Sequence, residues 1–334
     1  MPQADTSDQD LKPKPRSLPL LRWRSASFPV DWEAVLPGSA PLHLEVGFGD
    51  GRYTARRALE LPGERFVGIE LSGVSVLRAL KRMRRDGIGN VALLKGDAQF
   101  LLQQLFSAGS LSTITVNFPD PWPKGRHEEN RLLRRAFFEL AASRLVPHGS
   151  ILLATDHPGY LEFAREQALA SDLYGLGAAE PPAAVFETKY ALKWKTMGKP
   201  LYYQPFLRNS RPAGEFPHLE RPEQMPHALL QGPLPLEASL EKRVSQYADG
   251  HVILHEAALG RGPSPRWLVR VTVDEPALRQ QLLVVVQPRE GDELIVRLES
   301  FGDPIVTDAV RGAVHAVTEW ALEQPDLSLK ARYY

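Results

Sequence analysis

Short apolar runs alternate with amphipathic stretches from about residue 42 to residue 165. Four of these runs are rich in Val, Ile, Leu and Phe and are too short for helices, which is typical of buried strands. They cover residues 42–46, 66–69, 91–96 and 112–118. Apolar positions at helical spacing occur between them and again over residues 131–145. The alternation predicts an α/β fold, with a parallel sheet and helices on both faces.

The rhythm changes after residue 145. We expect a strand at residues 150–155, a helix from about Tyr160, and two strands around residues 183–190 and 201–206 that form a hairpin-like edge. The stretch from Arg211 to Pro235 then contains six prolines and no apolar periodicity. Such a composition indicates an extended linker.

The C-terminal part of the chain is predicted to be a small antiparallel α+β module. Alternate apolar residues from Trp267 to Val273 share one face of a strand. A helix-like stretch at residues 237–247 precedes the predicted strands, and an amphipathic helix at residues 304–323 follows them. The predicted strands cover residues 251–259, 267–274, 282–287 and 293–299.

These patterns divide the chain into four parts. Residues 1–19 are polar and Pro-rich and are predicted to be a disordered tail. Residues 20–210 form the α/β domain, residues 211–236 the linker, and residues 237–334 an accessory module whose role the sequence does not reveal.

Composition narrows the class of protein. The chain has 334 residues, of which 43% are hydrophobic and 24% charged, as in ordinary globular proteins. It contains no cysteine, which excludes disulfides and thiolate metal sites. Its histidines lack the spacing of metal ligands, so we expect no metal. No apolar run approaches the ~20 residues of a membrane-spanning helix, so we expect no membrane association.

The formal net charge is zero, but the charge is unevenly distributed. Residues 213–334 carry 12 Lys and Arg against 18 Asp and Glu, a net charge of −6, and residues 1–212 carry 28 against 22, a net charge of +6. Five cations of the basic part fall within eight positions, and they are either a solvated helix face or a surface for phosphates. They are Arg78, Lys81, Arg82, Arg84 and Arg85.

A proline-rich loop carries the strongest candidate chemistry. Three of the five residues from Pro119 to Pro123 are prolines, which excludes a helix or an interior strand there. The loop follows a predicted buried strand, and open α/β sheets place their chemistry at the C-terminal ends of strands. It holds a carboxylate, an aromatic plane and a cation in one short segment: Asp120, Trp122 and Lys124.

A glycine-rich turn follows the first predicted strand. Gly47, Gly49 and Gly51 stand at alternate positions before a helical stretch, so the backbone there can approach a ligand closely. The spacing is G-x-G-x-G and differs from the G-x-G-x-x-G of dinucleotide-binding proteins. Glu45 precedes the turn, and a carboxylate at that point suits a cationic ligand or an amino group better than a pyrophosphate.

Acidic residues also end the next two strands. Glu70 ends the second strand, where a carboxylate can accept hydrogen bonds from both hydroxyls of a ribose. Asp97 follows the third strand and precedes Ala98, and it is placed to accept from the amino group of an adenine. Each acid by itself fits a helix N-cap as well as a ligand contact. The repetition at four successive strand ends favours a binding site.

Together these motifs resemble the bacterial tRNA (guanine-N7-)-methyltransferases. The resemblance runs from about residue 42 to residue 206 and is carried by Glu45–Gly51, Gly68–Glu70, Asp97-Ala98, Phe118–His127, Ala154–Asp156, Thr188–Tyr190, Lys193-Trp194 and Gly198–Tyr202. It implies a seven-stranded Rossmann-like fold of the class I methyltransferases. It also implies a cytoplasmic enzyme that transfers a methyl group from S-adenosylmethionine to N7 of guanine 46 in the tRNA variable loop. The sequence identifies no protein partner.

The resemblance and the motifs assign roles to individual residues. Asp120 is the catalytic residue. Binding of S-adenosylmethionine is assigned to Glu45, Gly47, Gly49, Gly51, Glu70, Asp97, Ala98 and Asp120. Binding of tRNA is assigned to Lys124, Arg126, Asp156, Thr188, Lys189 and Tyr190.

The chain departs from the family pattern at two places. Ala191 stands where the family usually has a glutamate, and the basic run after His127 is diluted to Glu128–Arg131. Two other interpretations stay open from the sequence alone. In the first, the chain is a methyltransferase that acts on a small molecule or a protein. In the second, it is a catalytically degenerate protein that binds tRNA without methylating it.

Overall fold

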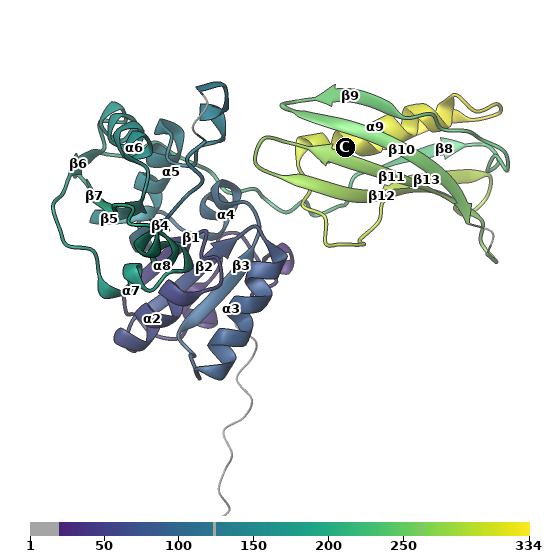
Figure 1. Ribbon diagram of the computed structural model, residues 1–334. Helices are drawn as coiled ribbons and strands as arrows, with labels where there is room; N and C mark the ends of the chain where they lie inside the picture. The colour runs from purple at the N-terminus through teal and green to yellow at the C-terminus, as the bar shows by residue number, and fades with distance from the viewer. Residues whose placement is uncertain (1–19, 123–124, 261) are drawn as a thin grey trace, which may run out of the picture. The chain divides into compact units, whose positions relative to one another are not determined.

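The computed structural model describes residues 20–122, 125–260 and 262–334. The described chain forms two compact units (Figure 1). The first unit contains residues 31–98 and 108–214 together with the residues just before Arg22, and the second contains residues 215–334. Two short segments of the N-terminal half, residues 22–30 and 99–107, cluster with the second unit. The predicted tail at residues 1–19 lies outside the described residues.

A mixed sheet forms the centre of the first unit. In the described part of the chain its seven strands run in the order β3-β2-β1-β4-β5-β7-β6. Neighbouring strands from β3 to β5 are parallel, and β7 is antiparallel to both of its neighbours. The strands are β1 (Leu42–Val46), β2 (Arg65–Glu70), β3 (Val91–Lys95), β4 (Leu111–Asn117), β5 (Leu145–Thr155), β6 (Tyr174–Leu176) and β7 (Tyr202–Arg208).

Strand order and crossover handedness determine where the helices lie. The chain moves from β1 to β3 in one direction and from β4 to β5 in the other, so right-handed crossovers place α2 (Arg52–Glu60) and α3 (Gly73–Arg85) on one face and α5 (Arg135–Arg144) on the opposite face. Apolar residues of α2 and α3 pack against β2 and β3 in one buried cluster. The doubly wound α/β architecture predicted from the sequence is confirmed.

The remaining elements of the N-terminal half are short or lie near its edges. They are the 3₁₀ helices η1 (Trp23–Ser25) and η2 (Gly125–Asn130) and the helices α1 (Trp32–Val35), α4 (Ala98–Leu105), α6 (Pro158–Ala170), α7 (Ala183–Phe186) and α8 (Lys189–Thr196).

The predicted strand at residues 183–190 is wrong, because this stretch forms α7 and the start of α8. Pro182 precedes the first helical residue of α7, and the hydroxyl of Thr188 caps α8 by accepting a hydrogen bond from the Ala191 N–H (3.1 Å). Both are helix-start signals, and they outweigh the β-propensity of the short apolar run.

The second unit contains an antiparallel sheet that packs against one helix. Its seven described strands run in the order β14-β8-β13-β12-β11-β10-β9. Apolar residues of α9 (Asp308–Leu322) and alternate residues of the strands form its core. The strands are β8 (His227–Gln231), β9 (Arg243–Tyr247), β10 (Gly250–Gly260), β11 (Arg266–Asp274), β12 (Arg279–Pro288), β13 (Glu293–Leu298) and β14 (Ser328–Tyr333). The predicted α+β module is therefore confirmed as an architecture.

Two predictions at the start of this module are wrong. The expected linker at residues 211–236 contains β8, which pairs with β13 and β14 inside the second sheet. The helix-like stretch at residues 237–247 contains β9, which forms a hairpin with β10. In both cases the backbone N–H and C=O groups of the segment form hydrogen bonds with another strand. The local sequence pattern gives no sign of that partner strand.

Within the described residues, no helix combines the length and the apolar character that crossing a membrane requires. The described side chains also include no group of His, Asp and Glu arranged to hold a metal ion.

Candidate active site

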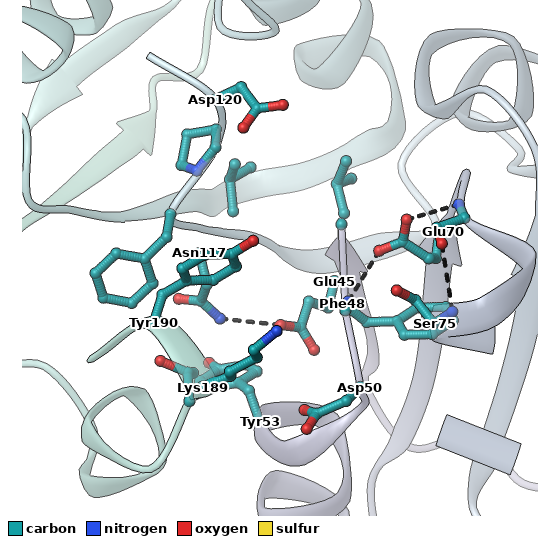
Figure 2. A pocket seen from close by; sticks show the side chains of 18 of the residues that line it. Glu45, Phe48, Asp50, Tyr53, Glu70, Ser75, Asn117, Asp120, Lys189 and Tyr190 are labelled. Atoms are coloured by element: carbon teal, nitrogen blue, oxygen red, sulfur yellow. Dashed lines mark hydrogen bonds between the residues drawn. The ribbon is translucent and has the colours of Figure 1, made fainter. Parts of the chain in front are cut away.

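A cavity of about 450 Å³ opens at the C-terminal ends of β1, β2 and β4 (Figure 2). Strand β1 lies between β2 and β4, so the direction of the crossovers reverses on either side of it. The loops after these strands therefore diverge and leave a crevice, which is the usual ligand site of an open α/β sheet. The sequence positions its acidic residues at this edge.

Gly47 and Gly49 form the cavity wall after β1. Both have left-handed backbone conformations, with φ of +74° and +56°, and a Cβ added to either would have no neighbour within 4 Å. Both residues line the cavity, so a side chain there would point into open space that a ligand can use. Gly51 has a different function, because a Cβ on it would lie 2.7 Å from Cβ of Ala79. Its missing side chain lets α2 pack against α3.

Glu70 holds the glycine turn in place. One oxygen of its carboxylate accepts a hydrogen bond from the Gly49 N–H (2.9 Å), and the other accepts from the Ser72 N–H (2.8 Å), as Figure 2 shows. Each carboxylate oxygen has a second lone pair. Glu70 can therefore support the turn and still accept hydrogen bonds from a ligand in the cavity.

Glu45 forms the floor of the cavity and is buried. Its carboxylate accepts hydrogen bonds from the Thr54 hydroxyl and from the Asn117 side-chain amide (3.0 Å; Figure 2). Burial raises the pKa of Glu45 to about 7, the hydrogen bonds from Thr54 and Asn117 oppose this rise, and the nearby Glu70 charge adds to it. Oδ1 of Asn117 is buried without a hydrogen-bond partner in the described structure. The floor therefore offers acceptors for a cationic or amino group.

The raised pKa of Glu45 predicts a pH-dependent loss of stability. The carboxyl group is protonated more readily in the folded than in the unfolded chain, so its contribution to the free energy of unfolding is full below pH ~4.5 and is lost as the pH rises through about 7. Glu45→Gln cannot ionise, so we expect its stability relative to the wild type to rise by about 3 kcal/mol between pH 4.5 and pH 8. Urea unfolding of both proteins across this range measures the difference, and parallel pH profiles would contradict the prediction.

The loop after β4 has a constrained backbone. Phe118 and Trp122 have positive φ angles, of 52° and 42°. Residues other than glycine rarely adopt this backbone conformation, because it costs roughly 1–3 kcal/mol per residue. It persists only where the surrounding structure enforces it. The Phe118 N–H donates a hydrogen bond to the Ala154 carbonyl (2.7 Å), which anchors the start of the loop. Asp120 is exposed at the cavity wall.

Arg131 anchors the end of this loop from below. Its guanidinium donates to the carbonyls of Pro121 (3.0 Å) and Trp122 (3.1 Å), pairs with Glu128 (3.0 Å), and lies 4.5 Å from the ring centroid of Phe163. Arg131 is only 7% exposed. The sequence suggested a diluted basic run at this point and missed this role, because the carbonyls that Arg131 binds carry no sequence signal.

The start of α8 forms the wall opposite the glycine turn. Thr188, Lys189 and Tyr190 all line the cavity, and Figure 2 shows the last two beside it. The Tyr190 ring lies 6.4 Å from the ring of Phe118, so two aromatic side chains stand together at this side of the cavity. Ala191, next in sequence, is buried, and a small apolar residue fits this position.

Most but not all of the predicted residues meet at the cavity. Glu45, Gly47, Gly49, Glu70, Asp120, Thr188, Lys189 and Tyr190 line it, whereas Gly51, Asp97, Ala98 and Asp156 do not. Asp97 follows β3 and Asp156 follows β5. In the sheet, β3 lies beyond β2 and β5 lies beyond β4, so both strands are one position further from β1 than the strands that border the cavity. Lys124 lies outside the described residues, and the described part of Arg126 is its backbone in η2. The cavity also includes residues that the sequence did not indicate: Tyr53, Ser75, Asn117, Asn130 and Leu132.

The basic face predicted on α3 is partly neutralised. Arg82 donates a hydrogen bond to the main-chain carbonyl of Asp50 (3.1 Å), and its guanidinium lies 3.5 Å from the side-chain carboxylate of the same residue. Arg85 pairs with the carboxylate of Asp86 (2.6 Å). Arg78 lines the cavity. Pairing of Arg82 and Arg85 supports the solvated-face interpretation for these two residues, and Arg78 is the member of the set closest to the candidate chemistry.

Comparison with known proteins places this arrangement among methyltransferases. Residues 39–204 match the family model described as "Putative methyltransferase". The chain is 42% identical over 300 residues to the tRNA (guanine-N(7)-)-methyltransferase of Thermus thermophilus, with 90% of this chain and 93% of that protein aligned. It is 41% identical over 317 residues to the protein of the same name from Deinococcus radiodurans, with 92% and 97% aligned. A solved structure, the 16S rRNA methyltransferase KamB, covers 53% of this chain and 92% of its own at 16% identity, with a TM-score of 0.41.

Proposed function

We propose that this chain, which belongs to the tRNA (guanine-N7-)-methyltransferase family, transfers a methyl group from S-adenosylmethionine to N7 of a guanine in the variable loop of tRNA. The observation that carries the proposal is the cavity at the ends of β1, β2 and β4, where Glu45, Glu70 and Asp120 face one crevice. A cytoplasmic location, as expected from the sequence, remains a prediction.

The cavity floor fits the amino-acid part of S-adenosylmethionine. The unpartnered Oδ1 of Asn117 and the carboxylate of Glu45 are hydrogen-bond acceptors that an ammonium group would satisfy. Gly47 and Gly49 leave room for close approach of the ligand. When bound, S-adenosylmethionine supplies a methyl group on a sulfonium centre that departs as a neutral thioether. An ionised Glu45 would balance part of the positive charge.

Glu70 is proposed to accept hydrogen bonds from the ribose hydroxyls, because its carboxylate ends β2 and lines the cavity. Glu70→Ala should weaken binding of S-adenosylmethionine by roughly 1.5–3 kcal/mol, the usual range for a hydrogen bond to a charged group. Isothermal titration calorimetry measures this change. Glu70→Gln keeps the length of the side chain and one acceptor oxygen, but its NH2 group cannot accept a hydrogen bond from the Gly49 or Ser72 N–H, so its affinity should also fall. An unchanged affinity in the alanine variant would remove Glu70 from the binding site.

The chemistry places few demands on the protein. N7 of guanine carries a lone pair and no proton, so attack on the methyl group needs no general base. The protein must hold the base in line with the methyl group and stabilise the positive charge that develops on the ring. Asp120 is exposed at the cavity wall, and its carboxylate is proposed to supply that stabilisation. Tyr190 is 46% exposed beside the cavity and offers a ring on which the guanine can stack.

The position of the guanine is tested with tRNA transcripts. A transcript with the variable-loop guanine at position 46 should accept one methyl group from labelled S-adenosylmethionine, and a transcript with adenine at that position should accept none. Methylation of both transcripts would place the target elsewhere in tRNA. Methylation of neither transcript would favour one of the two alternatives. The chain would then methylate a small molecule or a protein, or would bind tRNA without catalysing a reaction.

A further inference from the structure

The helix α8 and the turn after it form a basic surface that the catalytic cavity does not use. From Thr188 to Pro200 the chain carries four lysines and no acidic residue. All four are exposed, and three of them lie beyond the cavity lining: Lys193, Lys195 and Lys199. Exposed apolar side chains, Leu192 and Met197, lie among these lysines.

Two of the lysines gather around one indole ring. The ammonium nitrogen of Lys199 lies 3.7 Å from the ring centroid of Trp194, and that of Lys193 lies 4.6 Å from it. The Lys199 ammonium also donates to the Asp156 carboxylate (3.1 Å). An ammonium group has three N–H donors. Asp156 and the indole ring contact one part of the ammonium group. The side chain of Lys199 is still 41% exposed, so its remaining N–H donors can reach a ligand.

The charges in this cluster do not balance. Two like charges close to one ring repel each other, and among the described residues Asp156 is the one carboxylate within 4 Å of any of the four lysines. The cluster therefore has an excess positive charge and exposed donors. A phosphate group is the complementary ligand, because it brings negative charge and several acceptor oxygens.

We propose that Lys193 and Lys199, fixed around Trp194, form a phosphate-binding site for the tRNA backbone next to the target nucleotide. Asp156 is in this account a positioning residue, which orients the Lys199 ammonium and does not enter the cavity. The inference rests on the proposed function, since it takes tRNA as the polyanion. It also gives Asp156 an indirect role in tRNA binding, through Lys199.

The test compares Lys193→Ala and Lys199→Ala with Lys195→Ala, which removes the same charge from the same segment but has no ring contact in the described structure. Binding of an unmodified tRNA transcript is measured at several NaCl concentrations. Each of the first two substitutions should weaken binding roughly 3- to 10-fold and lower the slope of log K against log salt by roughly 0.7–0.9, the value for one lost phosphate contact. Affinity for S-adenosylmethionine should stay unchanged.

Trp194→Leu keeps every charge and removes the ring, so it should also weaken tRNA binding. The lysine variants decide the question if this variant does not fold. Equal effects of all three lysine substitutions would mean that the segment attracts tRNA through its overall charge and contains no defined phosphate site. Unchanged tRNA affinity in Lys193→Ala and Lys199→Ala would also refute the proposed site. A wild-type protein that does not methylate tRNA would instead overturn the proposed function, so the two failures are distinguishable.

Discussion

Replacing Asp120 with asparagine should lower the rate of methyl transfer to tRNA by roughly 100-fold or more. Asparagine preserves the shape of the side chain in the loop and removes its charge. The charge matters because guanine becomes cationic as N7 takes the methyl group, and the loss of a positioned electrostatic group costs about two to three powers of ten in rate. The effect should fall on kcat, because the neutral guanine of the ground state gains less from the carboxylate.

Asp97→Asn is the matched control for Asp120→Asn. Asp97 also follows a strand of the same sheet, but it does not line the cavity. Its predicted contact is with the adenine of S-adenosylmethionine, so its substitution should raise KM for S-adenosylmethionine and leave kcat nearly unchanged. Single-turnover assays with saturating tRNA separate the two effects. Near-wild-type turnover of Asp120→Asn would show that the carboxylate does not serve the reaction.

The second large effect is expected from Arg131, which lies outside the cavity lining. Arg131→Met leaves the carbonyls of Pro121 and Trp122 without the guanidinium that now donates to them. The loop then loses the contacts that hold its positive φ angles, and Asp120 loses its position. We expect turnover to fall more than tenfold, with a decrease of roughly 1–3 kcal/mol in the free energy of unfolding. Activity assays and urea unfolding measure the two quantities.

Arg135→Met is the control, because it removes the same charge from the start of α5. Arg135 is exposed and pairs with Glu139 on its own helix, and surface pairs of this kind contribute little. Arg131→Lys adds a second test. It keeps the charge but cannot bridge two carbonyls with a planar fork, so it should restore little activity. Full activity of Arg131→Met would mean that the loop keeps its shape without this anchor.

The sequence predicted the parts of the fold that local patterns determine. The strands that become β1 to β5 are short apolar runs, and burial in a parallel sheet requires that composition. Their order could not be derived from the runs themselves. The strand predicted at residues 183–190 is instead α7 and the start of α8, because apolar spacing over eight residues does not separate a helix from a strand, while the N-cap residues Pro182 and Thr188 do.

The candidate site was predicted where its residues lie at strand ends, as with Glu45, Glu70 and Asp120. The sequence did not separate the glycine that packs helices, Gly51, from the two that face the cavity. It also missed Arg131, because that residue binds main-chain carbonyls whose direction depends on the folded loop. Contacts to backbone atoms and to residues distant in sequence have no local signature, so local patterns reveal neither the packing of Gly51 nor the anchoring by Arg131.

The central claim is that this chain methylates N7 of guanine in tRNA. Mass spectrometry of nucleosides tests it most directly, after tRNA that lacks the modification has been incubated with S-adenosylmethionine and the protein. The account predicts one 7-methylguanosine per tRNA with the wild-type chain and, in the same reaction time, far less with Asp120→Asn. A methylated nucleoside other than 7-methylguanosine, or none with the wild-type chain, would contradict it.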